Sequence, residues 1–167
     1  MSVSNLVIKI TDALKPVLVK IIPQEYLSRA KKAYMNRNTT KLKDAKIAPY
    51  KPGRYAEGIN LIGSIQAASG LGQSSRLVAA ELEASGMPYS IKEHHISEQL
   101  SMTEHEFDAK FSDELPYDIN LLHINAHEFT VSYMQLGKQV WDYRYNIAFW
   151  LWELEEFPAE WICLLYT

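Results

Sequence analysis

The fold is decided by residues 58–93, which read GINLIGSIQAASGLGQSSRLVAAELEASGMPYSIKE. Residues 58–65 are a short, isoleucine-rich apolar run, typical of a strand that is buried on both faces of a parallel sheet. Residues 73–85 place apolar side chains at helical spacing, and Gly86 ends the helix because glycine adopts the left-handed conformation without steric cost. Residues 88–93 begin with a proline and form a second strand. Strand, glycine-containing loop, helix and strand make a βαβ unit, which predicts a parallel sheet.

The remaining chain continues the same alternation of strands and helices. Residues 118–125 (DINLLHIN) and 145–152 (YNIAFWLW) have the apolar composition of two further strands, and residues 129–137 between them predict a short helix. The polar and acidic residues 94–116 predict a long loop with some helix, and residues 158–166 predict the first turns of a last helix. We therefore expect a Rossmann-like α/β fold, a three-layer parallel sheet that stops after four strands.

Charge divides the chain into two parts. Residues 1–56 contain twelve Lys or Arg and three acidic residues, a net charge of +9, whereas residues 57–167 contain five bases and seventeen acids, a net charge of −12. Apolar residues in the first part recur at helical spacing: Leu6, Ile10, Leu14, Ile21. We expect a basic amphipathic helical leader and linker over 1–56, followed by an incomplete domain over 57–167.

Two roles for the leader remain open. A basic amphipathic segment could lie on the anionic inner face of a membrane, or it could pack on the domain. The basic stretch carries few interleaved aromatic residues, so we expect no nucleic-acid partner.

Composition excludes several classes of protein. The 167 residues contain a single cysteine, Cys163, which excludes a disulfide framework and a multi-cysteine zinc site. We expect no bound metal. No run of about 18 uncharged apolar residues predicts a membrane span, and no signal peptide is evident. We therefore expect a cytoplasmic protein, either free or peripheral on the inner membrane face.

The loop after the first strand, residues 68–76 (ASGLGQSSR), has two interpretations. Glycines and the start of a helix expose backbone amides, which bind phosphate, but the same residues also make a tight turn into a helix with serine caps. The loop is not a P-loop, because no lysine follows its second glycine. It fits the dinucleotide fingerprint poorly, since Ser75 stands where that pattern ends in glycine. Glu93 lies 21 residues after Gly72, where a ribose-binding acid would fall, so a nicotinamide cofactor remains an alternative.

The third predicted strand ends in His123-Ile-Asn-Ala-His-Glu. Ligands of open parallel sheets bind at the carboxyl ends of the strands, so Asn125 and His127 are candidates for contacts to a sugar or phosphate. His123 more often represents a hydrogen-bonded core histidine.

The fourth predicted strand runs into Trp150-Leu-Trp152-Glu153. Tryptophan rings pack on the apolar face of a sugar, and a carboxylate accepts hydrogen bonds from hydroxyls. An aromatic core face followed by a solvated acidic turn explains the same residues. We expect this aromatic tip and the amides around Gly70 and Gly72 to converge on one edge of the sheet.

Two stretches resemble one known family. Residues 58–91 resemble the opening βαβ unit of family 4 (group 1) GT-B glycosyltransferases, and residues 145–161 (YNIAFWLWELEEFPAEW) resemble the tryptophan-rich segment of a bacterial polysaccharide-type branch. The resemblance implies a retaining transferase with two Rossmann-like domains, of which the N-terminal one binds the acceptor. It also implies that Gly70, Leu71 and Gly72 approach the diphosphate of the donor.

The resemblance departs from the family at one position. Many members carry a histidine where this chain has Trp150. The candidates for catalysis are His127 and Glu153. From their places at the strand ends, the candidates for acceptor or sugar contacts are Asn125, His127, Trp150, Trp152 and Glu153.

The family's donor-binding carboxylates belong to a second domain, which we expect to be missing. The chain is then expected to be the acceptor-side half of an enzyme that transfers a sugar from a nucleotide-sugar to a saccharide or lipid-linked acceptor. We expect this half alone to be inactive, with the nucleotide-sugar as substrate and no cofactor. The alternatives are a fragment of a nicotinamide-dependent oxidoreductase and a non-enzymatic remnant.

Overall fold

The computed structural model describes Tyr26, Arg29 and residues 47–96, 100–151 and 155–156. The chain divides into two compact units, Met1–Ala45 and Lys46–Thr167. The predicted leader lies largely outside the described residues, although Tyr26 and Arg29 are helical and exposed. Among the described residues, no helix is long and apolar enough to cross a membrane.

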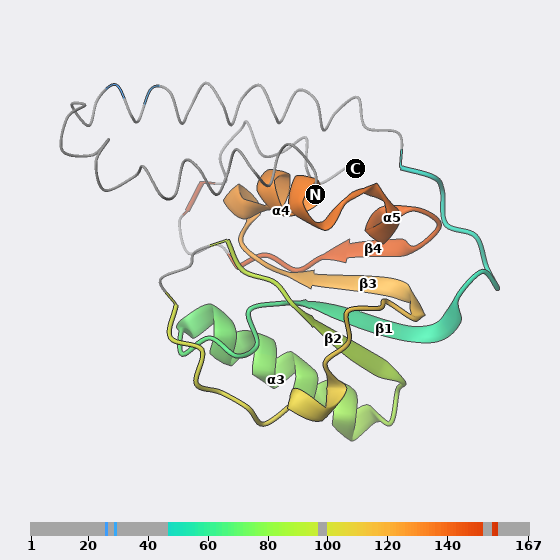
Figure 1. The fold of residues 1–167 in the computed structure, drawn as a ribbon, viewed down its shortest axis with the longest axis horizontal. Coiled ribbons are helices and arrows are strands. Elements are labelled where there is room, and N and C mark those ends of the chain that lie inside the picture. The colour runs from blue at the N-terminus through green and yellow to red at the C-terminus, as the bar shows by residue number, and fades with distance from the viewer. Residues whose placement is uncertain (1–25, 27–28, 30–46, 97–99, 152–154, 157–167) are drawn as a thin grey trace. The chain divides into compact units, whose positions relative to one another are not determined.

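The second unit is an α/β structure built on one parallel sheet (Figure 1). The four strands lie in the order β2-β1-β3-β4, and each neighbouring pair is parallel. The elements follow one another along the chain as β1 (Ala56–Gly63), α3 (Gly70–Ser85), β2 (Tyr89–Glu93), η1 (Asp108–Lys110), β3 (Tyr117–His123), η2 (Ala126–Glu128), α4 (Phe129–Leu136), α5 (Lys138–Trp141) and β4 (Tyr145–Ala148).

The predicted βαβ unit and parallel sheet are confirmed, with shifted boundaries. Helix α3 begins at Gly70, three residues earlier than predicted, because Ser69 caps it. It ends at Gly86, which has a φ of 70° and takes the left-handed conformation that the sequence predicted. Strand β4 ends at Ala148, four residues earlier than predicted.

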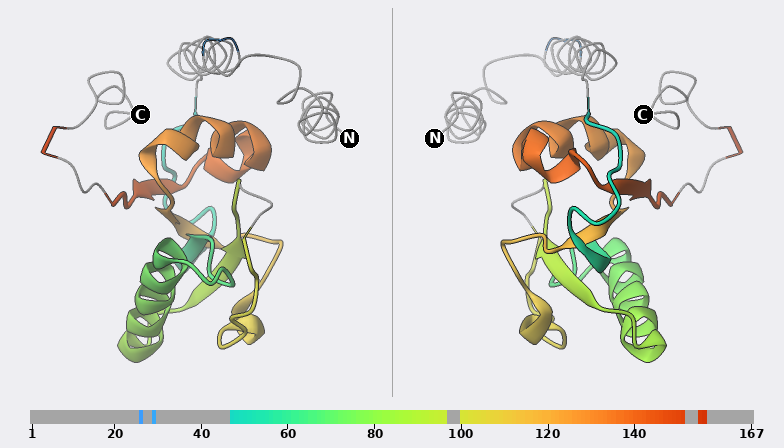
Figure 2. Two further views of the ribbon diagram at one scale, coloured as in Figure 1. Left: turned by 90° about the vertical axis from the view of Figure 1, so that its left-hand side faces the viewer. Right: turned by 90° about the vertical axis from the view of Figure 1, so that its right-hand side faces the viewer.

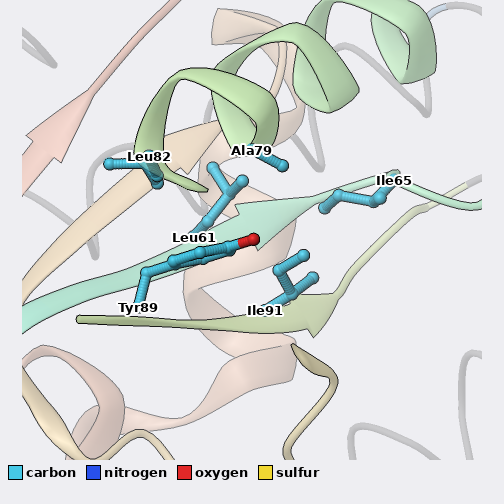
Figure 3. Close-up of a cluster of buried hydrophobic side chains, with 6 residues drawn as sticks. All are labelled: Leu61, Ile65, Ala79, Leu82, Tyr89 and Ile91. Carbon is cyan, nitrogen blue, oxygen red and sulfur yellow. The ribbon is translucent and has the colours of Figure 1, made fainter. Parts of the chain in front are cut away.

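Helices cover the two faces of the sheet separately. Figures 1 and 2 show α3 on one side of the strands and the α4–α5 pair on the other. On the α3 side, a buried apolar cluster joins β1, β2 and the helix (Figure 3); its members are Leu61, Ile65, Ala79, Leu82, Tyr89 and Ile91. Burying these side chains supplies most of the driving force for this layer, because each one removes apolar surface from water.

A row of polar side chains crosses the sheet on its other face. Ser90, Asn60, Asn120 and Asn146 stand in register on the four successive strands. The Ser90 hydroxyl donates to Asn60 Oδ1 (3.2 Å), Asn60 Nδ2 donates to Asn120 Oδ1 (2.9 Å), and Asn120 Nδ2 donates to Asn146 Oδ1 (2.8 Å). We call these four residues the polar row. It holds the strands in one register, since a slip of one residue would move each side chain to the opposite face.

A short outer segment extends the sheet beyond β2. Phe111 forms a parallel bridge with Ile91, and Ser112 N donates to Ile91 O at 2.9 Å. With this segment counted as a rudimentary strand, the spatial order is that of the first five strands of the doubly wound nucleotide-binding fold. The topology is therefore compatible with a Rossmann-like domain.

Residues 47–55, which were expected to belong to the linker, belong to the second unit. Ala48 N donates to Asp142 Oδ1 (2.8 Å), and the Tyr50 hydroxyl donates to Asp118 Oδ2 (2.9 Å). Asp118, which accepts the hydrogen bond from Tyr50, is buried at the start of β3. These contacts fasten the segment to the amino-terminal edge of the sheet, away from the carboxyl ends of the strands.

Candidate functional site

The candidate site lies at the carboxyl edge of the sheet, between β1 and β3. All four strands are parallel, so the loops that follow them emerge at the same edge. The chain leaves β1 for α3 on one face and leaves β3 for α4 on the other. Such a reversal is the topological switch point, where open α/β sheets bind their ligands. The glycine loop and residues 123–128 are therefore neighbours at the position where a ligand is expected.

The start of α3 offers two unused backbone donors. The Ser69 side chain caps the helix by accepting from Gly72 N (3.1 Å), and Gln73 N donates to Ser69 O (2.8 Å). Within the described part of the chain, the amides of Gly70 and Leu71 donate to no acceptor, and Gly70 is exposed. The helix dipole adds a partial positive charge at this end. The pair of amides can accept an anion.

Gly72 has a packing role at the same turn. A Cβ at this position would overlap the carbonyl oxygen of Ala67 and crowd that of Ser64, so the loop can fold back on the helix only with glycine here. A Cβ at Gly70, in contrast, would meet no atom within 4 Å. The two glycines therefore differ: Gly72 packs against the loop backbone, whereas Gly70 faces open space.

A buried arginine braces the loop from behind. Arg76 Nη1 donates to the carbonyl oxygens of Ile65 (2.8 Å) and Ala67 (2.9 Å), and its Nη2 donates to Gln73 Oε1 (3.0 Å). The side chain is buried, and no carboxylate among the described residues forms an ion pair with it. Its charge is balanced only by dipoles, so it adds positive potential behind the free amides. The sequence placed Arg76 in the helix without indicating this role.

His123 connects the glycine-loop helix to the tip of β4. Its Nε2 lies 2.8 Å from Ser74 Oγ in α3, and its Nδ1 lies 3.0 Å from the carbonyl oxygen of Phe149, just after β4. The imidazole also stacks on the Phe149 ring, with 4.7 Å between centroids and 14° between planes. The prediction of a hydrogen-bonded core histidine is confirmed, since His123 is fully buried. The described part of the aromatic tip lies at the same edge as the start of α3, and His123 links the two through Phe149 and Ser74.

The aromatic tip is divided between the two faces of the sheet. Phe149 stacks on His123 on the face that carries α3, whereas Trp150 packs edge-to-face on Phe129 of α4, with 5.9 Å between centroids. Phe149, which no sequence pattern indicated, is therefore the aromatic residue of the tip that contacts His123 on the α3 side of the sheet. Trp152 and Glu153 lie outside the described residues.

Asn125 and His127 both lie at the switch point, but they differ in hydrogen bonding and in exposure. The Asn125 side chain accepts from the Glu128 backbone amide and Glu128 reciprocates, so the pair makes a capping box at the start of η2. This occupies the Asn125 oxygen. His127 is exposed, and its Nε2 lies 4.0 Å from Glu128 Oε1. Of the two candidates, the His127 ring is the more accessible to a ligand.

Residues 101–103, in the acidic loop between β2 and β3, pair with the residues just before Gly70. Ala68 N donates to Ser101 O (2.8 Å), Thr103 N donates to Gln66 O (3.1 Å), and Ala67 pairs with Met102 in an antiparallel bridge. The contact spans more than 30 residues of sequence, and no local pattern indicated it. As a result, Ser101 and Thr103 lie next to the start of the glycine loop.

Three ionisable residues, Glu93 to His95, lie at the end of β2 at the same edge. Glu93 Oε2 accepts from Gln66 N, just before the glycine loop (3.1 Å), and its Oε1 lies 3.4 Å from His95 Nδ1. His94 is buried, and its Nε2 lies 2.8 Å from Ser132 Oγ in α4. Burial, helped by the nearby charges of His95 and Lys92, lowers the pKa of His94 to about 4, so its ring is neutral at pH 7.

Comparisons with protein-family models, with curated proteins and with solved structures found no match to this chain. Among the described residues, no group of three or more His, Cys, Asp or Glu side chains could hold a metal ion. The function must therefore be argued from the residues and their geometry.

Proposed function

We propose that this chain is the acceptor-side half of a retaining GT-B glycosyltransferase of the bacterial polysaccharide type. In this proposal the Gly70 and Leu71 amides approach the diphosphate of a nucleotide-sugar. The sugar lies toward the tip of β4, and the acceptor is a saccharide or a lipid-linked saccharide. The donor-binding carboxylates come from a second domain, so this half binds the diphosphate weakly and transfers no sugar by itself.

One observation carries the proposal. The Gly70 and Leu71 amides, which donate to no acceptor among the described residues, stand at the switch point and are linked through His123 to the tip of β4. A sugar diphosphate has two kinds of surface, an anionic group and a ring with an apolar face. The amides and the helix dipole suit the first, and an aromatic tip suits the second. The buried Arg76 supports the same proposal, because its charge, which has no ion-pair partner among the described residues, favours an anion at the loop.

A single backbone donor can be removed to test this. Gly70→Pro deletes the Gly70 amide at the first position of the helix, where proline is favoured. The preceding Ser69 has φ −144° and ψ 165°, an extended conformation that a following proline tolerates. Gly70→Ala is the matched control, because its Cβ meets nothing and its amide remains.

The assay is an amide NMR titration of the full chain with UDP, GDP and ADP in turn, and with sulfate at equal ionic strength. We expect one nucleotide to shift the Gly70 and Leu71 signals with a millimolar Kd. Gly70→Pro should weaken that binding about tenfold, the equivalent of one charge-assisted hydrogen bond, while Gly70→Ala binds as the wild type does. Failure of all three nucleotides to shift these signals, or shifts equal to those with sulfate, would contradict the proposal.

A nicotinamide cofactor is the second candidate, favoured by the position of Glu93 at the carboxyl end of β2, where a ribose-binding acid stands in dinucleotide-binding folds. The carboxylate is already engaged by the Gln66 amide, which a ribose would have to displace. Adding NAD to the same titration distinguishes the two. NAD binding that weakens in Glu93→Gln, with no binding of the nucleoside diphosphates, would favour the oxidoreductase.

A further inference from the structure

We infer that His123 is a positioning residue, which fixes the start of α3 relative to the tip of β4 through the hydroxyl of Ser74. The role rests on the proposed function, since it concerns how the diphosphate end and the sugar end of the site are held at a set separation. The histidine itself is fully buried, so its ring is not accessible to a ligand. It acts through the elements that it joins.

The two hydrogen bonds of His123 select one tautomer of the neutral ring. A carbonyl oxygen only accepts, so the bond to Phe149 O requires the proton on Nδ1. In the neutral ring Nε2 then carries the lone pair, and the Ser74 hydroxyl donates to it over 2.8 Å. In the neutral ring, the Ser74 hydroxyl is therefore the donor to Nε2 and the Phe149 carbonyl is the acceptor from Nδ1. These two hydrogen bonds connect α3 to β3 and β3 to the tip of β4.

The position of Ser74 makes this link relevant to the free amides. Ser74 lies one helical turn after Gly70, on the same rigid helix, so a shift of its backbone moves the Gly70 and Leu71 amides with it. At the other end, the ring stacks on Phe149 and holds the carbonyl beyond the last residue of β4. Among the residues that the structure describes, no other side-chain hydrogen bond joins α3 to β3 or β4.

The chain contains a matched control for this bond. His94 and Ser132 form a second buried histidine–serine pair of equal length, 2.8 Å, which joins the end of β2 to α4. Ser74→Ala and Ser132→Ala each delete one hydroxyl from one such bond. Only the first deletion breaks the connection between α3 and the tip of β4. Ser74→Thr keeps a hydroxyl at the first position and tests for rescue.

The first measurement needs no ligand. In 15N spectra of the full chain, wild-type His123 should show the tautomer with the proton on Nδ1. Ser74→Ala should shift the Gly70, Leu71 and Phe149 amide signals and release the tautomer. Ser74→Thr should restore both, and Ser132→Ala should leave both unchanged. Undisturbed Gly70 and Phe149 signals in Ser74→Ala would overturn the inference.

The second measurement adds UDP. Ser74→Ala should raise the Kd about five-fold, the equivalent of one neutral hydrogen bond, while Ser132→Ala leaves it unchanged. Equal effects of the two deletions would make His123 an ordinary core residue and overturn the inference. Where GDP or ADP binds in place of UDP, the same comparison is made with that nucleotide. Failure of all three to bind the wild type refutes the proposed function alone, because the ligand-free spectra still decide whether His123 couples the two elements.

Discussion

Replacing Asn120 by leucine tests whether the polar row stabilises the sheet. Asn120 is fully buried in β3, and its side chain takes part in three hydrogen bonds. Its Nδ2 donates to Val140 O (2.7 Å) and to Asn146 Oδ1 (2.8 Å), and its Oδ1 accepts from Asn60 Nδ2 (2.9 Å). Leucine has a similar volume, so the change removes the hydrogen bonds with little change in packing.

The loss of unfolding free energy depends on which other hydrogen bonds remain open to the three groups that Asn120 contacted. Val140 O keeps a bond from Arg144 Nη1 (3.2 Å), and the half-buried Asn146 can reach water. Asn60 is fully buried, and one of its amide hydrogens loses its acceptor while the other still donates to Tyr117 O. One buried unsatisfied donor, together with the lost bonds, costs about 2–4 kcal/mol of unfolding free energy.

Urea unfolding followed by circular dichroism measures this cost, with Ser90→Ala as the matched control. Ser90 gives one hydrogen bond to Asn60 Oδ1, which also accepts from Tyr117 N, so its loss should cost about 1 kcal/mol or less. The double variant Asn60→Leu/Asn120→Leu should cost less than the sum of its parts, since neither partner is left unpaired. A cost for Asn120→Leu no larger than for Ser90→Ala, or strict additivity in the double variant, would refute the reasoning.

Two further predictions concern the residues around the site. Because the folded-state pKa of His94 is lowered from 6.5 to about 4, the unfolded chain binds the proton first, and about 3 kcal/mol of stability present above pH 6.5 should be lost as the pH falls toward 4. His94→Gln should flatten that part of the pH profile of the unfolding free energy; an unchanged profile would mean that the ring titrates normally. Gly72→Ala should cost about 2–4 kcal/mol in thermal or urea unfolding, because the backbone of Ala67 must move, whereas Gly70→Ala should cost less than about 0.5 kcal/mol. Equal stabilities of the two alanine variants would contradict the packing role of Gly72.

The role of Gly72 changes how the glycine loop is tested. A β-branched residue at Gly72 would be a direct way to block the approach of a diphosphate to the loop. The structure shows that such a residue would first disturb the turn, so a loss of binding would report folding. Gly70 faces open space, and substitutions there separate the two effects.

Local features of the sequence determined the elements of the second unit. Apolar runs predicted the strands, the helical spacing of residues 73–85 predicted α3, and Gly86 predicted its end, because these signals depend only on residues a few positions apart. The parallel sheet followed from the order of the elements. The carboxyl-edge location of the glycine loop followed in turn from that topology.

Tertiary structure alone decided how the elements are held together. Asn60 and Asn120 are 60 residues apart, and Ser74 and His123 are 49 apart. A strand pattern repeats every two residues, so it tells which face a side chain occupies but not which residue of the next strand stands beside it. Register and helix placement make that choice, and they are set only when the layers pack and buried polar side chains such as Asn60 and His123 find their partners.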